Sequence, residues 1–261
     1  MTFQVLLSMM NKNDNSFIEK MNIHSDLLVI NQSDENELEN FKYNNYEIKI
    51  FSFAEKGVGL SRNNALMRTN ADIALVADDD CVYVNNYKNL IIDSFKKYPM
   101  ADVIFFNMIS KNQKRVEKLT GKAYRVRWYN CLKFGAFRMA IKVQKIRKMN
   151  INFSLLFGGG ARYSCGEDTL FIVECLKKGL KLYAVPVEIG TVEQKESTWF
   201  KGYTEKYFFD KGALFAAISK QWAWLLCLQF LFRYRHFYKK LGSFFYVFKL
   251  MTRGGKDFNK L

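Results

Sequence analysis

Short apolar segments alternate with helical patterns through the first half of the chain, and this alternation constrains the fold more than any other feature. The segments are apolar on both faces, as the strands of a buried parallel sheet are. The alternation therefore predicts an α/β domain in which a mixed, mostly parallel sheet is flanked by helices. The expected strands are Phe3–Met9, Leu27–Ile30, Glu47–Phe53, Ile73–Ala77, Val103–Asn107 and Leu182–Val187, and the expected helices are Ser16–Met21, Ser61–Arg68, Tyr87–Lys97 and Asp168–Lys178.

The size and composition of the chain fit a folded protein that holds no zinc cage and no disulfide framework. Its 261 residues, 49% of them hydrophobic, are enough to bury one large core. The five cysteines are odd in number and widely spaced, with no Cys-x-x-Cys pair, which favours a reducing cytosol. Residues 1–10 are apolar but lack a basic leader, so a first strand is expected there rather than a signal peptide.

The last 42 residues differ from the rest in charge and aromatic content. Residues 220–261 contain nine Lys and Arg against the single acid Asp257, so that +8 of the net charge of +15 lies there, with 12 of the 42 aromatic residues. The apolar stretch Trp222–Phe232 is too short to cross a bilayer, which takes roughly 18 residues. It is interpreted either as a core helix or as part of a membrane-surface anchor, because aromatic residues beside Lys and Arg suit a bilayer interface. We favour the anchor, and expect a helical, basic and aromatic appendage over 219–261.

Three adjacent carboxylates, Asp78, Asp79 and Asp80, follow the apolar segment Ile73–Ala77 directly. In open α/β sheets ligands bind at the carboxyl ends of strands, which is where this triplet falls. A Mg²⁺ or Mn²⁺ ion would relieve the repulsion between the carboxylates, and it prefers oxygen ligands. The alternative is a solvated acidic turn.

Two further motifs contain charged residues beside glycines. Residues 56–64 combine two glycines with Arg62, a pattern that suits a phosphate group but also an ordinary turn from strand to helix. Gly166, Glu167 and Asp168 stand at the start of an expected helix, where an acid either caps the helix or acts as a general base.

The order of these motifs resembles the family 2 glycosyltransferases of the GT-A fold, in particular the short bacterial enzymes that build surface polysaccharides. The likeness covers roughly residues 3–215. It rests on Gly57–Ala65 (Gly-Val-Gly-Leu-Ser-Arg-Asn-Asn-Ala), Asp78–Asp80, Phe134–Phe137, Phe157–Ala161, Glu167-Asp168 and Glu196–Trp199.

The resemblance implies a donor side within about residues 1–110. Asp80, with Asp78, would hold a divalent metal, Mn²⁺ or Mg²⁺. Asp78 or Asp79 would meet the ribose or a metal-bound water, and Arg62 would contact the nucleotide. Asn31 stands where many relatives have an aspartate that reads the base, which is a departure from the family's pattern.

The resemblance implies an acceptor side within about residues 111–218. Asp168, beside Glu167, matches the family's catalytic base, and Trp199, Gly159 and Gly160 fall in segments that line the acceptor. The implied enzyme transfers a sugar from a nucleoside-diphosphate sugar, most simply a UDP-sugar, to a hydroxyl of a lipid-linked glycan. One base opposite one leaving group predicts a single displacement with inversion at the anomeric carbon. Such an enzyme would be cytoplasmic and peripheral on the inner face of the plasma membrane.

Three other functions are weaker alternatives. The net charge also permits a nucleic-acid-binding protein, but the charge is concentrated in the tail and no zinc-finger, RNP or helix-turn-helix signature appears. A sugar-1-phosphate nucleotidyltransferase would have a glycine-rich, arginine-containing loop after the first strand, where Ser8–Lys12 stands instead. An inactive structural relative is disfavoured by the intact acidic triplet together with Glu167 and Asp168.

Overall fold

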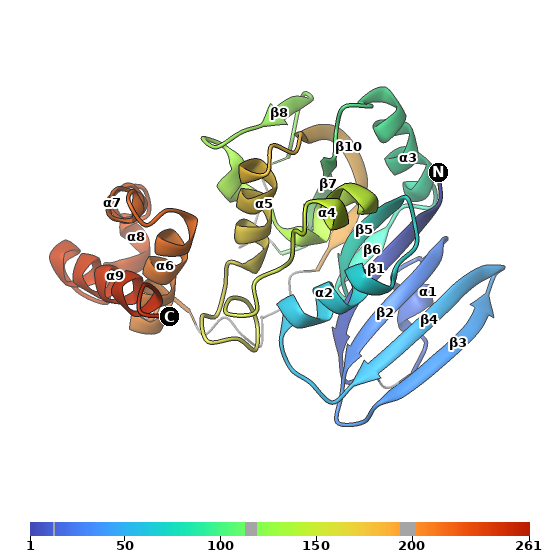
Figure 1. The fold of residues 1–261 in the computed structure, drawn as a ribbon, viewed down its shortest axis with the longest axis horizontal. Coiled ribbons are helices and arrows are strands. Elements are labelled where there is room, and N and C mark those ends of the chain that lie inside the picture. The colour runs from blue at the N-terminus through green and yellow to red at the C-terminus, as the bar shows by residue number, and fades with distance from the viewer. Residues whose placement is uncertain (13, 113–118, 194–201) are drawn as a thin grey trace.

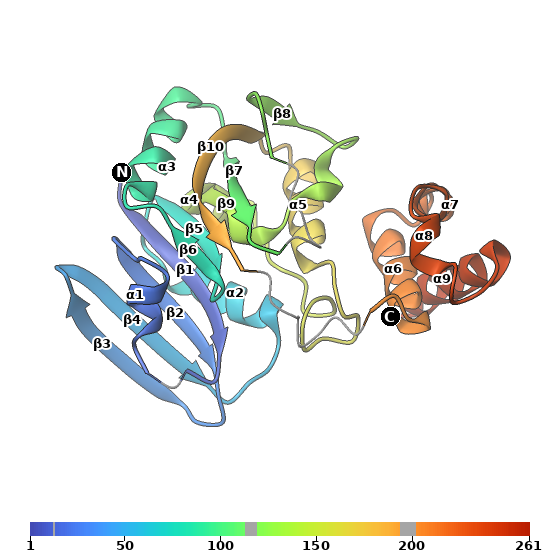
Figure 2. The same cartoon turned by 180° about the vertical axis from the view of Figure 1, so that it is seen from behind.

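The computed structural model describes residues 1–12, 14–112, 119–193 and 202–261. They form a ten-stranded mixed sheet with helices on both sides and a separate group of helices at the carboxyl end (Figures 1 and 2). The strands are β1 (Phe3–Met10), β2 (Asp26–Gln32), β3 (Glu37–Tyr43), β4 (Tyr46–Phe53), β5 (Ile73–Asp78), β6 (Cys81–Tyr83), β7 (Val103–Ser110), β8 (Tyr124–Val126), β9 (Met139–Lys142) and β10 (Leu182–Val192).

Six of the ten strands run in one direction. The sheet order is β3-β4-β2-β1-β5-β9-β7-β10-β6, with β8 paired to β10. Parallel pairs join β4, β2, β1 and β5, and another joins β7 to β10. Strand β9 is antiparallel to both β5 and β7, so these two also share a direction. The predicted mixed, mostly parallel sheet is confirmed.

Helices cover both faces of the sheet and bury its apolar side chains. The helices of this part are α1 (Phe17–Lys20), α2 (Val58–Arg68), α3 (Tyr87–Lys97), α4 (Val143–Lys148) and α5 (Glu167–Lys177). One core contains side chains of α1 and α3, such as Ile18 and Phe95, against one face. The other core contains side chains of α2, α4 and α5, such as Leu66, Ile146 and Phe171. The α/β layers follow from the two-sided apolar strands.

Four strands, β3, β6, β8 and β9, were not expected from the sequence. Strand β3 is polar and largely exposed because it is an antiparallel edge strand, joined to β4 by a turn in which Asn44 and Asn45 have positive φ. Strand β9 lies within residues 111–147, which are rich in Lys and Arg, and it inserts between β5 and β7. Its pattern is too short to be distinguished from a buried turn by periodicity.

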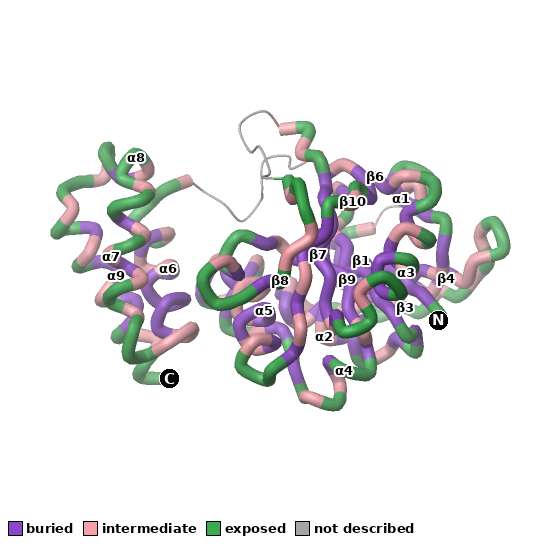
Figure 3. Tube along the Cα trace, turned by 90° about the horizontal axis from the view of Figure 1, so that it is seen from above, coloured by how far each residue is buried: buried purple, intermediate pink, exposed green. Residues whose placement is uncertain are grey.

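The last four helices, α6 (Glu205–Ile218), α7 (Ala223–Arg233), α8 (Arg235–Tyr238) and α9 (Phe244–Phe258), form a group that we call the helical unit. Its core combines Phe208 and Phe215 of α6 with Leu231 of α7 and Met251 of α9. In Figure 3, buried residues follow the strands of the sheet, and a separate buried set lies inside the helical unit.

The predicted division after residue 218 falls between two helices of the helical unit. Helix α6 packs along α9, because Gly212 and Gly254 bring the two backbones into contact. These glycines are too far apart in the sequence for the pairing to be read from a local pattern. Among the described residues, no helix is both long and apolar enough to span a membrane.

Candidate active site

The polar ends of neighbouring parallel strands meet at the carboxyl edge of the sheet. Ser8 of β1 is paired with Asp78 of β5, and Met9 of β1 with Asn31 of β2. Helix α2 begins at this edge, where Ser61 Oγ donates a hydrogen bond to Ser8 Oγ at 2.9 Å. The structure therefore brings the acidic triplet, Asn31 and the glycine-containing motif to one edge of the sheet, as their sequence positions predict.

Arg62 joins this edge to the start of α5. Its side chain is buried, Nη2 donates to Asp78 Oδ1 at 2.8 Å, and Nη1 donates to Glu167 Oε1 at 2.7 Å. The guanidinium also lies 5.4 Å from the centre of the Phe153 ring. Burial alone would lower the pKa of Arg62, but Asp78 and Glu167 raise it overall, so the guanidinium stays charged. Arg62 was predicted to contact the nucleotide; in the structure both its terminal nitrogens bind carboxylates, and it links two site segments.

Asp168 occupies the first turn of α5, beside Glu167. Its Oδ1 accepts a hydrogen bond from the backbone N–H of Thr169 at 2.6 Å. Burial raises the pKa of Asp168 to about 6, and the negative charge of Glu167 adds to the shift while Arg62 opposes it. A carboxylate with a pKa near neutrality is suited to general base catalysis. The hydrogen bond to Thr169 also satisfies a first-turn amide, so the capping role is compatible with this position.

A glycine-rich segment holds α5 next to the start of α2. The Val58 backbone N–H donates to the Gly159 carbonyl at 3.0 Å. A side-chain carbon at Gly160 would lie 3.1 Å from the backbone nitrogen of Gly57. Gly159 and Gly160, predicted on the acceptor side, therefore form one wall of the same edge, directly against α2.

Gly166 fixes the point at which α5 begins. It has a φ of +116°, and a side-chain carbon there would lie 2.6 Å from the Leu214 side chain of α6. Only glycine combines this conformation with such close packing. The start of α5, and with it Asp168, is thus packed directly against the helical unit.

The acidic triplet turns away from β5 into β6. Asp79 is exposed and Asp80 is half-buried, with its carboxylate 3.9 Å from the Cys81 sulfur. The Asp80 carbonyl accepts a hydrogen bond from the Glu193 backbone N–H at 3.0 Å, which places the end of β10 beside the triplet. Trp199, predicted on the acceptor side, lies outside the described residues.

The carboxylates at this edge could bind a hard cation such as Mg²⁺ only together with further oxygen ligands from water or a substrate. Within the described ranges, no group of three or more His, Cys, Asp or Glu side chains is arranged to hold a metal ion. Asp78 gives one oxygen to Arg62, which leaves its other oxygen and the Asp80 carboxylate as candidate ligands. Mg²⁺ characteristically takes one or two carboxylates together with water and substrate phosphates, so Asp78 and Asp80 would supply only the carboxylate part of such a donor set.

The side chain of Asn31 is engaged in the fold. It is buried, its Oδ1 accepts from the Lys12 backbone N–H at 3.0 Å, and its Nδ2 donates to Ser52 Oγ at 3.0 Å. The neighbouring Gln32 was not anticipated: its Oε1 accepts the backbone N–H of Gly57 at the start of α2. A polar pair at the end of an apolar strand was the available signal for both residues.

Comparison with known proteins shows the fold. No protein-family model and no curated protein sequence matches the chain. Among solved structures, residues 1–349 of S. aureus TarS in complex with UDP-GlcNAc align at a TM-score of 0.63 and 15% identity, over 93% of this chain and 75% of that one. The same fragment in complex with UDP aligns at 0.63 and 14% identity, over 93% and 74%. The chain has the GT-A-like architecture expected of a glycosyltransferase.

Proposed function

We propose that this chain transfers a glycosyl group from a nucleoside-diphosphate sugar to an acceptor hydroxyl, with Asp168 as the general base. The observation that carries the proposal is the position of Asp168: a carboxylate with a pKa of about 6, one residue from Glu167, which Arg62 ties to the carboxyl end of β5. Ligands of open α/β sheets bind at that edge. The likeness to TarS, whose structures contain UDP-GlcNAc and UDP, supports a UDP-sugar as the donor.

In the proposed reaction the acceptor hydroxyl donates its proton to Asp168 as it attacks the anomeric carbon. Asp168 performs this step only when ionised, that is, above its pKa of about 6. Arg62 binds Asp78 through one terminal nitrogen and Glu167 through the other. It therefore fixes the distance between the carboxyl end of β5, where the donor is proposed to bind, and the start of α5, which carries Asp168. A single base opposite a single leaving group gives inversion of the anomeric configuration.

Asp80 and Asp78 are the proposed ligands of a divalent cation, Mn²⁺ or Mg²⁺, bound together with the donor diphosphate. Such a cation would stabilise the negative charge that develops on the departing nucleoside diphosphate. Asp79, at the same turn, is exposed and is proposed to meet the ribose.

The proposed acceptor is a glycan, linked to a lipid, at the cytosolic face of the membrane. Gly159 and Gly160 are proposed to line its binding site, together with Trp199. Peripheral attachment through the basic carboxyl-terminal helices would bring the enzyme to such an acceptor, and net charge of +8 in residues 220–261 supports this.

The experiment is to offer the purified chain a panel of nucleotide sugars with Mn²⁺ and to measure nucleoside-diphosphate release. We expect release from at least one UDP-sugar, and expect Asp168→Asn to reduce it about 10²–10⁴-fold, the usual contribution of a general base. Asp80→Asn should raise the Mn²⁺ concentration needed for half-maximal activity.

The matched control is Asp93→Asn, because Asp93 is an exposed carboxylate on α3 that pairs with Lys96. It should leave both activity and Mn²⁺ dependence unchanged. Full activity in Asp168→Asn, or no turnover of any nucleotide sugar, would contradict the proposal.

A further inference from the structure

Helix α7 is apolar on two opposite faces. Cys227 and Leu231 are buried in the core of the helical unit. Leu225 and Phe232 lie on the opposite side of the helix and are exposed, Phe232 to 73%, and Trp224, in the first turn on the side of Cys227, is exposed to 52%. A helix that is apolar all round is normally buried or in contact with lipid. Within the described structure, the outward face of α7 is not covered by another helix.

The exposed apolar surface continues from α7 onto α9. The ring of Phe232 lies 5.1 Å from that of Phe244, and Phe244 lies 5.7 Å from Phe245, centre to centre. Phe245 is 80% exposed. The aromatic residues of the tail thus divide into two sets: those such as Tyr238, which form the core of the helical unit, and the exposed set Trp224, Phe232 and Phe245.

A basic stripe begins where the aromatic surface ends. Lys249, Arg253 and Lys256 follow Phe245 at intervals of four, eight and eleven residues, so all four side chains lie on one face of α9. All three basic residues are exposed. The single acid of the tail, Asp257, borders this stripe four residues after Arg253, and its carboxylate is paired with Arg162 at 2.9 Å.

We propose that Trp224, Leu225, Phe232 and Phe245, together with Lys249, Arg253 and Lys256, form a docking face for a bilayer that contains anionic lipids. The apolar side chains enter the interface between headgroups and acyl chains, and the basic side chains lie on the anionic headgroups. The exposed apolar residues alone, or the basic stripe alone, would have several explanations. Because the two adjoin on one surface, they together have the composition of a membrane interface.

Two other occupants fit the surface less well. A soluble polyanion such as RNA would be attracted by the basic stripe and would stack on the three aromatic rings, but it would leave the aliphatic Leu225 without an apolar partner. A second copy of the chain would cover the apolar residues but would bring two tails of net charge +8 face to face, which is repulsive.

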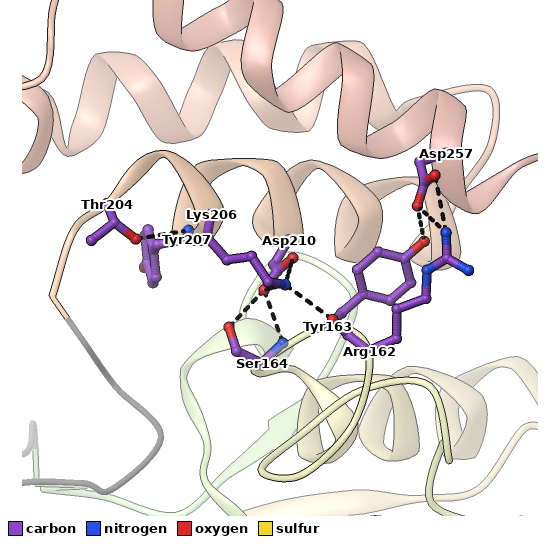
Figure 4. A network of polar contacts seen from close by, with 8 residues as sticks. All are labelled: Arg162, Tyr163, Ser164, Thr204, Lys206, Tyr207, Asp210 and Asp257. Carbon is purple, nitrogen blue, oxygen red and sulfur yellow. Dashed lines mark hydrogen bonds and ion pairs between the residues drawn. The ribbon is translucent and has the colours of Figure 1, made fainter.

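The helical unit is also attached to the candidate active site, on a different side from the docking face. Asp210 of α6 is completely buried and accepts hydrogen bonds from the Ser164 backbone N–H at 3.0 Å and from Ser164 Oγ at 2.7 Å (Figure 4). Asp257 of α9 accepts from Arg162 and from Tyr163 Oη at 2.8 Å. Docking would therefore tether the loop before α5 to a membrane-bound helical unit; the use of this tether in glycosyl transfer rests on the proposed function, whereas lipid binding does not.

The test is flotation of the full chain with phosphatidylcholine vesicles, with and without phosphatidylglycerol. We expect binding only to the anionic vesicles. Lys249→Gln with Arg253→Gln and Lys256→Gln should weaken it about 100-fold, since the contributions of single basic residues add near an anionic surface. Trp224→Ser with Phe232→Ser and Phe245→Ser should weaken it at least about tenfold, and should abolish the part of the binding that survives high salt.

Matched controls come from the α/β part of the chain. Trp128 and Tyr129 are exposed to 53% and 83%, so Trp128→Ser with Tyr129→Ser tests exposed aromatics as such. Lys145→Gln with Lys148→Gln and Lys177→Gln removes three exposed charges elsewhere. Both sets should float like the wild type, and circular dichroism should show every variant folded.

Three results would overturn the docking face: equal flotation of the aromatic variant and the wild type, equal loss in the matched controls, or a dimer in sedimentation that the aromatic variant abolishes while no vesicle binds. Nucleoside-diphosphate release from a nucleotide sugar, measured without vesicles, should be the same in the docking variants and the wild type. Failure of lipid binding would therefore not contradict the proposed glycosyl transfer. Failure of glycosyl transfer would likewise not contradict lipid binding.

Discussion

Among single residues, Asp168 has a raised pKa, which suits it to act as a base but makes its ionised form destabilise the fold. Its folded-state pKa of about 6 is above the ordinary value of 3.8, because burial and Glu167 both oppose ionisation. As a base it works only when ionised. We therefore expect kcat/KM to fall tenfold per pH unit below about pH 6 and to be level above it, until other groups titrate.

The same raised pKa predicts an effect on stability. A carboxyl whose pKa is raised by folding favours the folded state fully below its unfolded pKa of about 4, and this contribution is lost as the pH rises through 6. Asp168→Asn removes the ionisation while its carbonyl can still accept the Thr169 N–H. It should therefore raise the free energy of unfolding by about 1–2 kcal/mol at pH 8, after allowance for partial exposure, with no gain at pH 4.

Urea denaturation of wild type and Asp168→Asn at the two pH values makes this measurement. Glu174→Gln is the control, because Glu174 pairs with Lys178 on the exposed side of the same helix. If Asp168→Asn destabilised the protein at both pH values, the carboxylate would be a helix cap rather than a base under strain.

The candidate site residues were named from the sequence, but their partners in the fold were not. For Arg62 the residues alone left a phosphate contact and an ordinary strand-to-helix turn open, and the family resemblance implied a nucleotide contact. Its actual partners include Glu167, which is 105 positions away, and no local pattern reports such a contact. The sequence placed Asn31 at the end of a strand, and it lies near the end of β2. Its hydrogen bonds with Lys12 and Ser52 could not be predicted, because they depend on how β2 pairs with its neighbouring strands.

At the scale of elements, the close packing of α6 on α9 supports the start of α5. A side-chain carbon at Gly212 would overlap the carbonyl oxygen of Met251, so Gly212→Ala must push the two helices apart. Overpacking of this kind costs about 1–3 kcal/mol. We expect a loss of stability in this range, and faster hydrogen exchange of the Ser164 amide, whose partner Asp210 is on α6.

The control for this prediction is Gly121→Ala, because a side-chain carbon at Gly121 would meet no atom within 4 Å. It should change neither unfolding nor exchange at Ser164. Unchanged exchange at Ser164 in a destabilised Gly212→Ala variant would show that the helical unit does not brace the loop before α5.

The tail was recognised as a distinct segment by its charge, but its extent was not. Helix α6 lacks the basic composition of residues 220–261, and its membership in the helical unit depends on Gly212 and Gly254, which meet only in the folded chain. The short strand β9 was missed for a similar reason, since its place between β5 and β7 is a property of the sheet and not of its four residues.

In the whole molecule, the sheet collects the acidic triplet, Arg62 and the start of α5 at one edge. The helical unit forms a separate group that packs against the start of α5 and the loop before it (Figures 1 and 2). The two-sided apolar strands were sufficient to predict the layers. They also lead us to expect a ligand at this edge, because the carboxyl ends of parallel strands lie together.

The central claim is that a nucleoside diphosphate binds at this edge through a cation on Asp78 and Asp80. Its most direct test is a crystal structure of the chain with UDP and Mn²⁺, in which anomalous scattering locates the manganese. We expect a manganese peak between the diphosphate and these two carboxylates, with the Asp168 carboxylate facing the bound nucleotide. Nucleotide bound elsewhere, while Asp78–Asp80 contact neither metal nor phosphate, would contradict it.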